Sequence, residues 1–137
     1  MSQVKIKVGG LRFAARFEEA AAPLTCAAFR TLLPFEKQML QARWSGEAAW
    51  VPLGNLSLDL PLENATSHPS RGDILFYPGG ASETELLLTY GSARFAARVG
   101  QLAGTHFLTV TSGQEALGEL GQLVLWKGAQ TILIELA

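Results

Sequence analysis

The sequence has little of what marks several large classes of protein. Its 137 residues include one cysteine, Cys26, so an internal disulfide bond is excluded. The 11 Lys and Arg nearly balance the 12 Asp and Glu, without the basic excess or stripe that indicates nucleic-acid binding. No apolar run approaches the roughly 18 residues of a membrane-spanning helix, and the opening MSQVKIKVGG has no apolar signal segment. We therefore expect a cytoplasmic protein with neither a nucleic-acid partner nor a membrane partner.

Motifs for metal binding and for nucleophilic catalysis are also missing from the sequence. The two histidines, His68 and His106, fit no HExxH or similar spacing, and there is no CxxC pair. No GxSxG elbow is present, and the two Gly-Gly pairs match no phosphate-binding fingerprint, so both predict turns. Cys26 is interpreted as a small apolar side chain on a helix. We expect no metal and no cofactor.

The sequence does have a high and evenly spread apolar content. Apolar residues make up 48% of the chain and charged residues 17%, which predicts one sizeable core and one domain over residues 1–137. In residues 4–8, Val4, Ile6 and Val8 alternate with lysines, as is typical of a half-buried strand. Residues 11–17 alternate again after a Gly-Gly pair, which predicts a β-hairpin.

Two segments change to a helical spacing. Pro23 suits the first turn of a helix, and apolar residues then recur until Pro34 ends the segment after about three turns. Nearer the C-terminus, Ser112 and Glu115 match a capping box, in which each side chain hydrogen-bonds the backbone of the other residue. The apolar stripe that follows predicts a helix to about residue 126, with Gly128 at its C-terminal cap.

The other apolar segments predict short strands, at residues 36–44, 48–53, 74–77, 85–90, 106–111 and 131–136. Residues 55–61 also alternate, but Pro61 cannot donate to a strand ladder, so a strand there would lie at a sheet edge. About eight strands and two well-separated helices result, without regular βα alternation. Because a closed barrel leaves no exposed strand edges, we predict a mainly β fold: a closed barrel of about eight strands with two capping helices.

Polar and aromatic residues that could hold a ligand gather at the predicted strand ends. The longest polar loop lies within residues 63–91, and loops on a β scaffold often carry binding residues. Trp44 and Trp50 flank a predicted turn, so either they pack across a hairpin or Trp44 lines a pocket. Arg94 could bind a carboxylate with two hydrogen bonds, or lie in solvent. The candidate ligand-binding residues are Trp44, Glu63, Asn64, Tyr90, Arg94, Phe95 and His106.

Four stretches carry a family resemblance: PFEKQMLQARWSGEAAWVPL, ENATSHPSRGDILFYPGG, SETELLLTYG and GQLAGTHFLTV. They resemble an uncharacterised bacterial family of small proteins with a cyclophilin-like β-barrel, and the resemblance covers nearly the whole chain. It implies an eight-stranded barrel with a helix at each end, which agrees with the element count. It does not imply prolyl isomerase activity, because the sequence lacks the Phe-His-Arg run that supplies the catalytic arginine of cyclophilins.

Three functions remain open at this stage. The first is a barrel, expected to be a homo-oligomer, that binds a small amide or carboxylate in a cleft and has no isomerase activity. The second is an enzyme or enzyme subunit acting on amide or cyclic-amide metabolites, because related cyclophilin-like domains occur in subunits of bacterial enzymes that open cyclic amides. Glu63 or His106 would then be the general acid–base group. The third is a peptidyl-prolyl isomerase.

Overall fold

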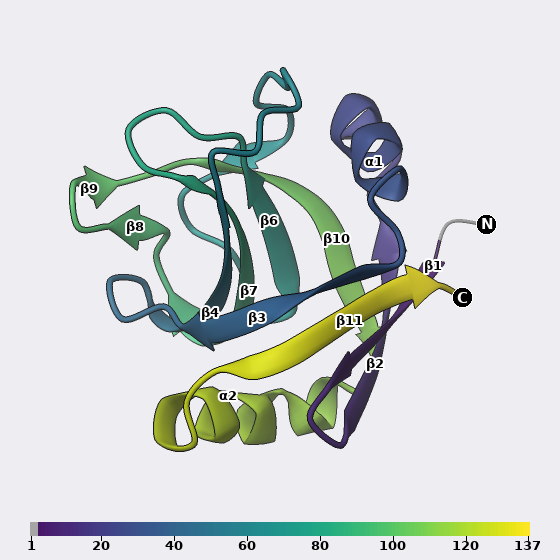
Figure 1. Cartoon of the computed structure of the whole chain (residues 1–137), viewed down its shortest axis with the longest axis vertical. Helices are drawn as coiled ribbons and strands as arrows, with labels where there is room; N and C mark the ends of the chain where they lie inside the picture. Colours follow the sequence, from purple (N-terminus) through teal and green to yellow (C-terminus); the bar gives the residue numbers. More distant parts are fainter. Residues whose placement is uncertain (1–2) are drawn as a thin grey trace.

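The computed structural model describes residues 3–137, and most of its strands form one closed barrel (Figure 1). The strands are β1 (Gln3–Val8), β2 (Leu11–Phe17), β3 (Phe35–Gln41), β4 (Gly46–Gly54), β5 (Ala65–Thr66), β6 (Asp73–Tyr77), β7 (Thr84–Ala93), β8 (Ala96–Ala97), β9 (Gly100–Gln101), β10 (Gly104–Ser112) and β11 (Gln130–Leu136). The helices are α1 (Pro23–Arg30), the 3₁₀ turn η1 (Gln114–Ala116) and α2 (Leu117–Trp126).

Eight of these strands close the barrel in the order β2-β1-β11-β3-β4-β7-β6-β10, with β10 pairing back onto β2. Each of these pairings is antiparallel. The short β5 adds to β10, and β8 and β9 form a separate two-stranded sheet. The prediction of a closed, mainly β barrel of eight strands with two helices is confirmed.

Apolar side chains at alternate positions of the strands fill the barrel interior. On β1, Val4, Ile6 and Val8 are fully buried, whereas Lys5 between them is exposed. Phenylalanines from α1 and from the barrel wall meet inside, and the rings of Phe29 and Phe107 are 5.0 Å apart in an edge-to-face arrangement. Such pairs are stabilising beyond their burial of apolar area.

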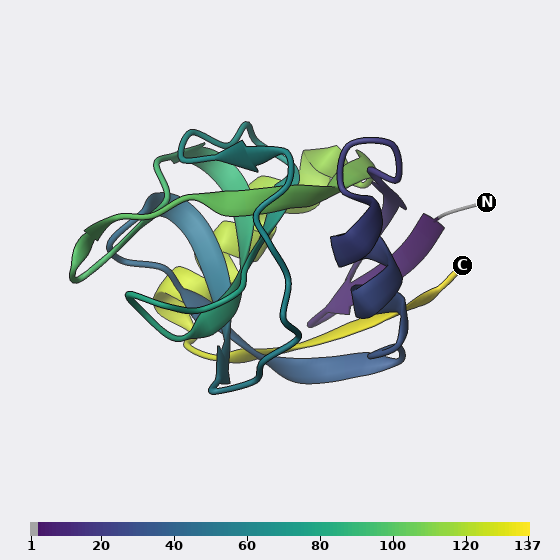
Figure 2. The same cartoon turned by 90° about the horizontal axis from the view of Figure 1, so that it is seen from above.

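The two helices lie at opposite ends of the barrel (Figures 1 and 2). Helix α1 lies against β10, and α2 lies against β3, β4 and β7. Helix α1 is shorter than the three turns predicted, because residues 31–33 bond to carbonyls three residues back and end the helix before Pro34. Within residues 3–137, no helix has both the length and the apolar character needed to cross a bilayer.

Two local predictions are wrong. Residues 55–61 form no strand, and Leu58 and Leu60 instead pack as partly buried side chains against the main core. The capping box is also absent: Ser112 ends β10, and Gly113 precedes η1 with no side-chain cap. Gly113 has φ 88° and a Cβ there would lie 2.6 Å from the Arg12 carbonyl oxygen, so this close approach of two backbones sets the turn. Gly128 follows the C-cap of α2 with φ 90°, as predicted.

Strand β7 is buried on both of its faces. Leu86 and Leu88 point into the main core, whereas Leu87 belongs to a second apolar cluster. The second cluster lies outside the barrel, where the segment carrying β8 and β9 covers β4, β6 and β7 and inserts Phe95 and Leu102. This outer layer, rather than the barrel interior, forms the setting of the candidate site.

Candidate functional site

The seven residues predicted to bind a ligand fall into two groups in the fold. Trp44, Arg94 and Phe95 lie at the outer layer, and Tyr90, whose ring is in the main core, reaches Gln41 beside them with its hydroxyl. Glu63, Asn64 and His106 lie near β10 and α1. The predicted cleft that combines both groups is therefore not formed by the side chains as the structure places them. Of the seven, Trp44 is the residue that lines the cleft described below.

In the first group, Trp44 is 54% exposed and lines a cleft. Phe95 lies beneath that cleft, fully buried, with its ring edge-to-face against Tyr77. The Tyr90 hydroxyl donates to Gln41 Oε1 at 2.6 Å, and burial raises the pKa of Tyr90. The Arg94 side chain is exposed, its amide donates to the Ser45 carbonyl, and it is not among the residues that line the cleft.

In the second group, Glu63 caps helix α1. Its carboxylate accepts hydrogen bonds from the amides of Thr25 at 2.7 Å and Leu24 at 3.3 Å. Burial alone would raise the pKa of Glu63, but these hydrogen bonds outweigh it and the pKa lies below its ordinary value. Since both carboxylate oxygens are engaged at the start of the helix, the geometry gives Glu63 a structural role instead of the acid–base role considered above.

Asn64 and His106 contact each other through β-type backbone and side-chain hydrogen bonds. The His106 ring nitrogen Nε2 lies 2.7 Å from Thr109 Oγ1 and 3.3 Å from Asp73 Oδ1. The Thr109 hydroxyl donates to Glu18 at 2.6 Å, so it accepts from His106. This chain of contacts joins the end of β2 to β6 and β10 on the barrel surface.

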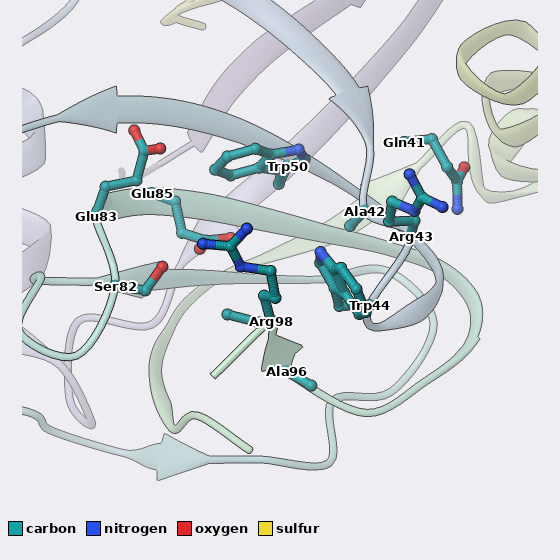
Figure 3. A pocket seen from close by; sticks show the side chains of 11 residues that line it. Gln41, Ala42, Arg43, Trp44, Trp50, Ser82, Glu83, Glu85, Ala96 and Arg98 are labelled. Carbon is teal, nitrogen blue, oxygen red and sulfur yellow. The ribbon is translucent and has the colours of Figure 1, made fainter. Parts of the chain in front are cut away.

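The cleft bordered by Trp44 has a volume of about 410 Å³ (Figure 3). Its floor is the outer face of β4 and β7, and its walls are the β3–β4 turn and β8. The Ser45 hydroxyl donates to the Ala96 carbonyl and accepts from the Ala96 amide, and these two hydrogen bonds hold the two walls together. The lining residues are Gln41, Ala42, Arg43, Trp44, Trp50, Ser82, Glu83, Glu85, Ala96, Ala97 and Arg98.

Two indole rings and two guanidinium groups border this cleft (Figure 3). Trp50 is half-buried on β4 and Trp44 stands in the β3–β4 turn, with the Arg43 guanidinium 5.6 Å from the Trp44 ring. Arg98 follows β8 and its side chain is exposed. Indole faces stack on planar rings, and guanidinium groups bind carboxylates with two parallel hydrogen bonds. The cleft therefore has the chemistry to hold a planar anion.

Glu85 is the buried charged residue of this cleft. The residue is 5% exposed, its cross-strand neighbours are Pro52 and Tyr77, and burial, with a smaller contribution from Glu83, raises its pKa from 4.5 to about 8. In the part of the chain that the structure describes, no hydrogen bond or ion pair engages its carboxyl group. Its carboxyl oxygens open on the cleft, since the fully buried side-chain atoms without a partner among the described residues are Thr25 Oγ1 and Thr89 Oγ1. Carboxyl groups with a perturbed pKa that line a cleft are candidate functional residues.

The sequence interpretation missed Glu85 because it treated residue 85 as the start of an apolar strand. The available signal was a carboxylate at the head of a run, ELLLTY, that is buried along its whole length. Trp50 was named only as a partner of Trp44, and Arg43 and Arg98 were not singled out. These residues come from segments far apart in the sequence, so no local motif joins them.

A second hollow, of about 550 Å³, lies where the chain leaves α1 and enters β3. It is lined by Leu32, Pro34, Phe35, Glu36, Lys37, Leu53, Asn55 and Leu56. Its charged side chains, Glu36 and Lys37, are exposed on β3. Since it has no buried charged group and no indole, the cleft at Glu85 is the stronger candidate.

Comparisons with known proteins agree with the barrel. One similar solved structure is McbB in complex with tryptophan, with 16% sequence identity and a TM-score of 0.75 over 97% of this chain. The chain spans only 44% of the McbB chain. Another is the solution structure of the hypothetical protein AF2241 from Archaeoglobus fulgidus, with 16% identity and a TM-score of 0.63, covering 99% of this chain and 95% of that one. At these identities the likeness shows the fold alone.

No curated protein matches the sequence. A family model does match, over residues 4–136, and its description is a protein of unknown function, DUF3830. This agrees with the expectation of an uncharacterised family that extends over nearly the whole chain. The chain belongs to the DUF3830 family.

Proposed function

We propose that this protein binds a small planar molecule carrying a carboxylate, in the cleft between Trp44, Trp50 and Arg98. The observation that carries the proposal is Glu85, a largely buried residue whose carboxyl group opens on the cleft and has no protein partner among residues 3–137. A desolvated carboxyl group costs stability unless a partner satisfies it, and a ligand in the cleft would be that partner. Small-molecule sites commonly combine aromatic walls with a few polar groups in this way.

The structural neighbour McbB supports the proposal as a precedent. Its structure was solved with tryptophan, a planar ring compound that carries a carboxylate. The matched barrel makes up under half of McbB, so this precedent concerns the class of ligand and not the position of a site.

The test is binding of aromatic carboxylates, measured by saturation-transfer NMR and calorimetry with benzoate, nicotinate, indole-3-acetate and tryptophan. At least one probe should bind saturably, and Trp44→Ala should weaken it about fivefold, the scale of one lost aromatic contact. Trp126→Ala is the matched control, because Trp126 is 73% exposed at the end of α2 and does not line the cleft. Absence of saturable binding, or equal loss in both variants, would contradict the proposal.

We also propose that the chain is one domain, cytoplasmic and homo-oligomeric. Leu125 and Trp126 support oligomer formation, because they are 49% and 73% exposed on neighbouring positions of α2. Light scattering after gel filtration should give a mass at least twice the 14.7 kDa of one chain, and Trp126→Asp should lower it. A monomer in the wild type would refute the oligomer.

Prolyl isomerase activity is not part of the proposal, since the cyclophilin Phe-His-Arg run is absent from the sequence. A protease-coupled isomerisation assay should show no rate above background. One observation favours a second candidate, an enzyme acting on amides or cyclic amides: a Glu85 pKa of about 8 makes this group a competent proton donor near neutral pH. Turnover of a cyclic-amide panel that Glu85→Gln abolishes would establish it.

A further inference from the structure

The surroundings of Glu85 constrain which chemical group it can meet. Its strand neighbours along β7 are Thr84 and Leu86, and across the ladders it faces Pro52, which has no amide hydrogen, and Tyr77. The Tyr77 hydroxyl accepts from the amides of Ala81 and Ser82, and among the described residues it forms no hydrogen bond with Glu85. The carboxyl group therefore faces the cleft with its hydrogen-bonding capacity unspent by the described residues.

The charged groups around Glu85 come from three elements. Glu83 precedes β7 and accepts a hydrogen bond from the Gly54 amide at 3.0 Å. Arg98 follows β8, and Arg43 lies in the β3–β4 turn (Figure 3). Neither guanidinium group forms an ion pair with Glu85 within the part of the chain described. Burial of residue 85 favours the neutral acid, and the neighbouring carboxylate of Glu83 adds a smaller contribution in the same direction.

A neutral carboxylic acid presents one donor and one acceptor side by side in a plane. The complementary group is a planar amide whose N–H and C=O point in the same direction, as in a lactam or imide ring. We propose that the ligand of this cleft is such a ring, with its N–H and C=O paired to Glu85 and a carboxylate directed toward Arg98. This inference rests on the proposed function and adds to it the class of ligand.

Two other ligand classes fit less well. An ammonium or amidine group would match an ionised Glu85, but it would enter a cleft already bordered by two guanidinium groups. A ligand carboxylate placed at Glu85 would face Glu83 as a like charge, and it would leave the guanidinium groups without a partner. A lactam that carries a carboxylate would pair its N–H and C=O with Glu85 and its carboxylate with Arg98. Both the acidic and the basic side of the cleft would then have a partner.

The test uses four probes. The lactam is 6-oxo-1,6-dihydropyridine-3-carboxylate, and its N-methyl derivative lacks the N–H donor. Benzoate keeps the ring and the carboxylate alone, and benzamidine represents the cation. At pH 7 the lactam should bind most tightly, with the N-methyl derivative about tenfold weaker, the scale of one unsatisfied buried hydrogen bond.

Variants of Glu85 separate this inference from the proposed function. Glu85→Gln keeps a donor and an acceptor and should retain lactam binding within about threefold, whereas Glu85→Leu should weaken the lactam about tenfold and leave benzoate unchanged. Raising the pH from 7 to 9 ionises Glu85 and should weaken lactam binding to the wild type about tenfold, but not binding to Glu85→Gln.

The possible outcomes separate the lactam inference from the proposed function. Equal binding of the lactam, its N-methyl derivative and benzoate, all weakened by Trp44→Ala, would overturn the lactam inference and leave the proposed function standing. Benzamidine binding that exceeds the lactam and strengthens with rising pH would also overturn the inference in favour of a cation. Binding of none of the four probes would overturn the proposed function for this ligand class, and the inference with it.

Discussion

Glu85 makes the stability of the barrel depend on pH. Its pKa rises from 4.5 to about 8 on folding, because burial disfavours the ionised form. The folded protein therefore holds one more proton than the unfolded chain between these two values, and the free energy of unfolding falls as pH rises through that window. The slope is about 1.4 kcal/mol per pH unit, so roughly 3 kcal/mol is lost between pH 5 and pH 7.5.

Glu85→Gln removes this ionisation and should remove the slope that comes from it. Urea unfolding at pH 5, 6.5 and 8 should give similar stabilities for the variant and the wild type at pH 5, with the variant more stable by a few kcal/mol at pH 8. Glu36→Gln is the matched control, because Glu36 is exposed on strand β3 and its replacement should leave the slope unchanged. Parallel pH profiles for wild type and Glu85→Gln would refute the account of Glu85 as a neutral buried acid.

The remaining predictions concern parts of the barrel away from the cleft. On α2, Gly118→Ala should raise the free energy of unfolding by about 0.5–1 kcal/mol, because a Cβ there meets open space. Gly121→Ala should lower the free energy of unfolding by about 1–3 kcal/mol, because its Cβ would overlap the Tyr90 ring. Urea midpoints equal to that of the wild type would contradict these two predictions. Glu63→Ala should lower the free energy of unfolding by about 1 kcal/mol at pH 7 by leaving the first amides of α1 uncapped, and Glu63→Gln by less; no loss in Glu63→Ala would count against the cap. Cys26 is fully buried, which raises its pKa to about 12, so a thiol reagent should react at the rate of unfolding; rapid native labelling would contradict this.

Much of the fold could be predicted because local patterns and burial agree along the chain. The alternation in β1 and β2 identifies a hairpin, and the paired register joins Val4 to Ala15 and Val8 to Leu11. Barrel closure was inferred from the number of apolar strands, and the pairing of β10 with β2 is that closure. These features depend on the alternation of apolar residues within each strand, so they can be predicted from a single sequence.

The failed predictions depend on contacts between distant segments. Ser112 and Glu115 have the spacing of a capping box, but the backbone of Arg12 approaches so closely that Gly113 sets the turn. Residues 55–61 alternate like a strand, but Leu58 and Leu60 pack against the main core from a segment without strand pairing. In both places the tertiary arrangement overrides a correct local pattern.

The residues of the candidate site were also only partly predictable, because they come together through contacts between distant segments. Trp44 was identified because a large aromatic beside a turn is conspicuous in any sequence. Glu85 was not, although a carboxylate in a strand buried on both faces is costly unless it serves a purpose. The cost becomes visible only when the outer layer carrying Phe95 and Leu102 is seen to cover β7. A polar residue inside an apolar run is therefore the feature to weigh first in a chain of this kind, ahead of the more numerous polar residues in its loops.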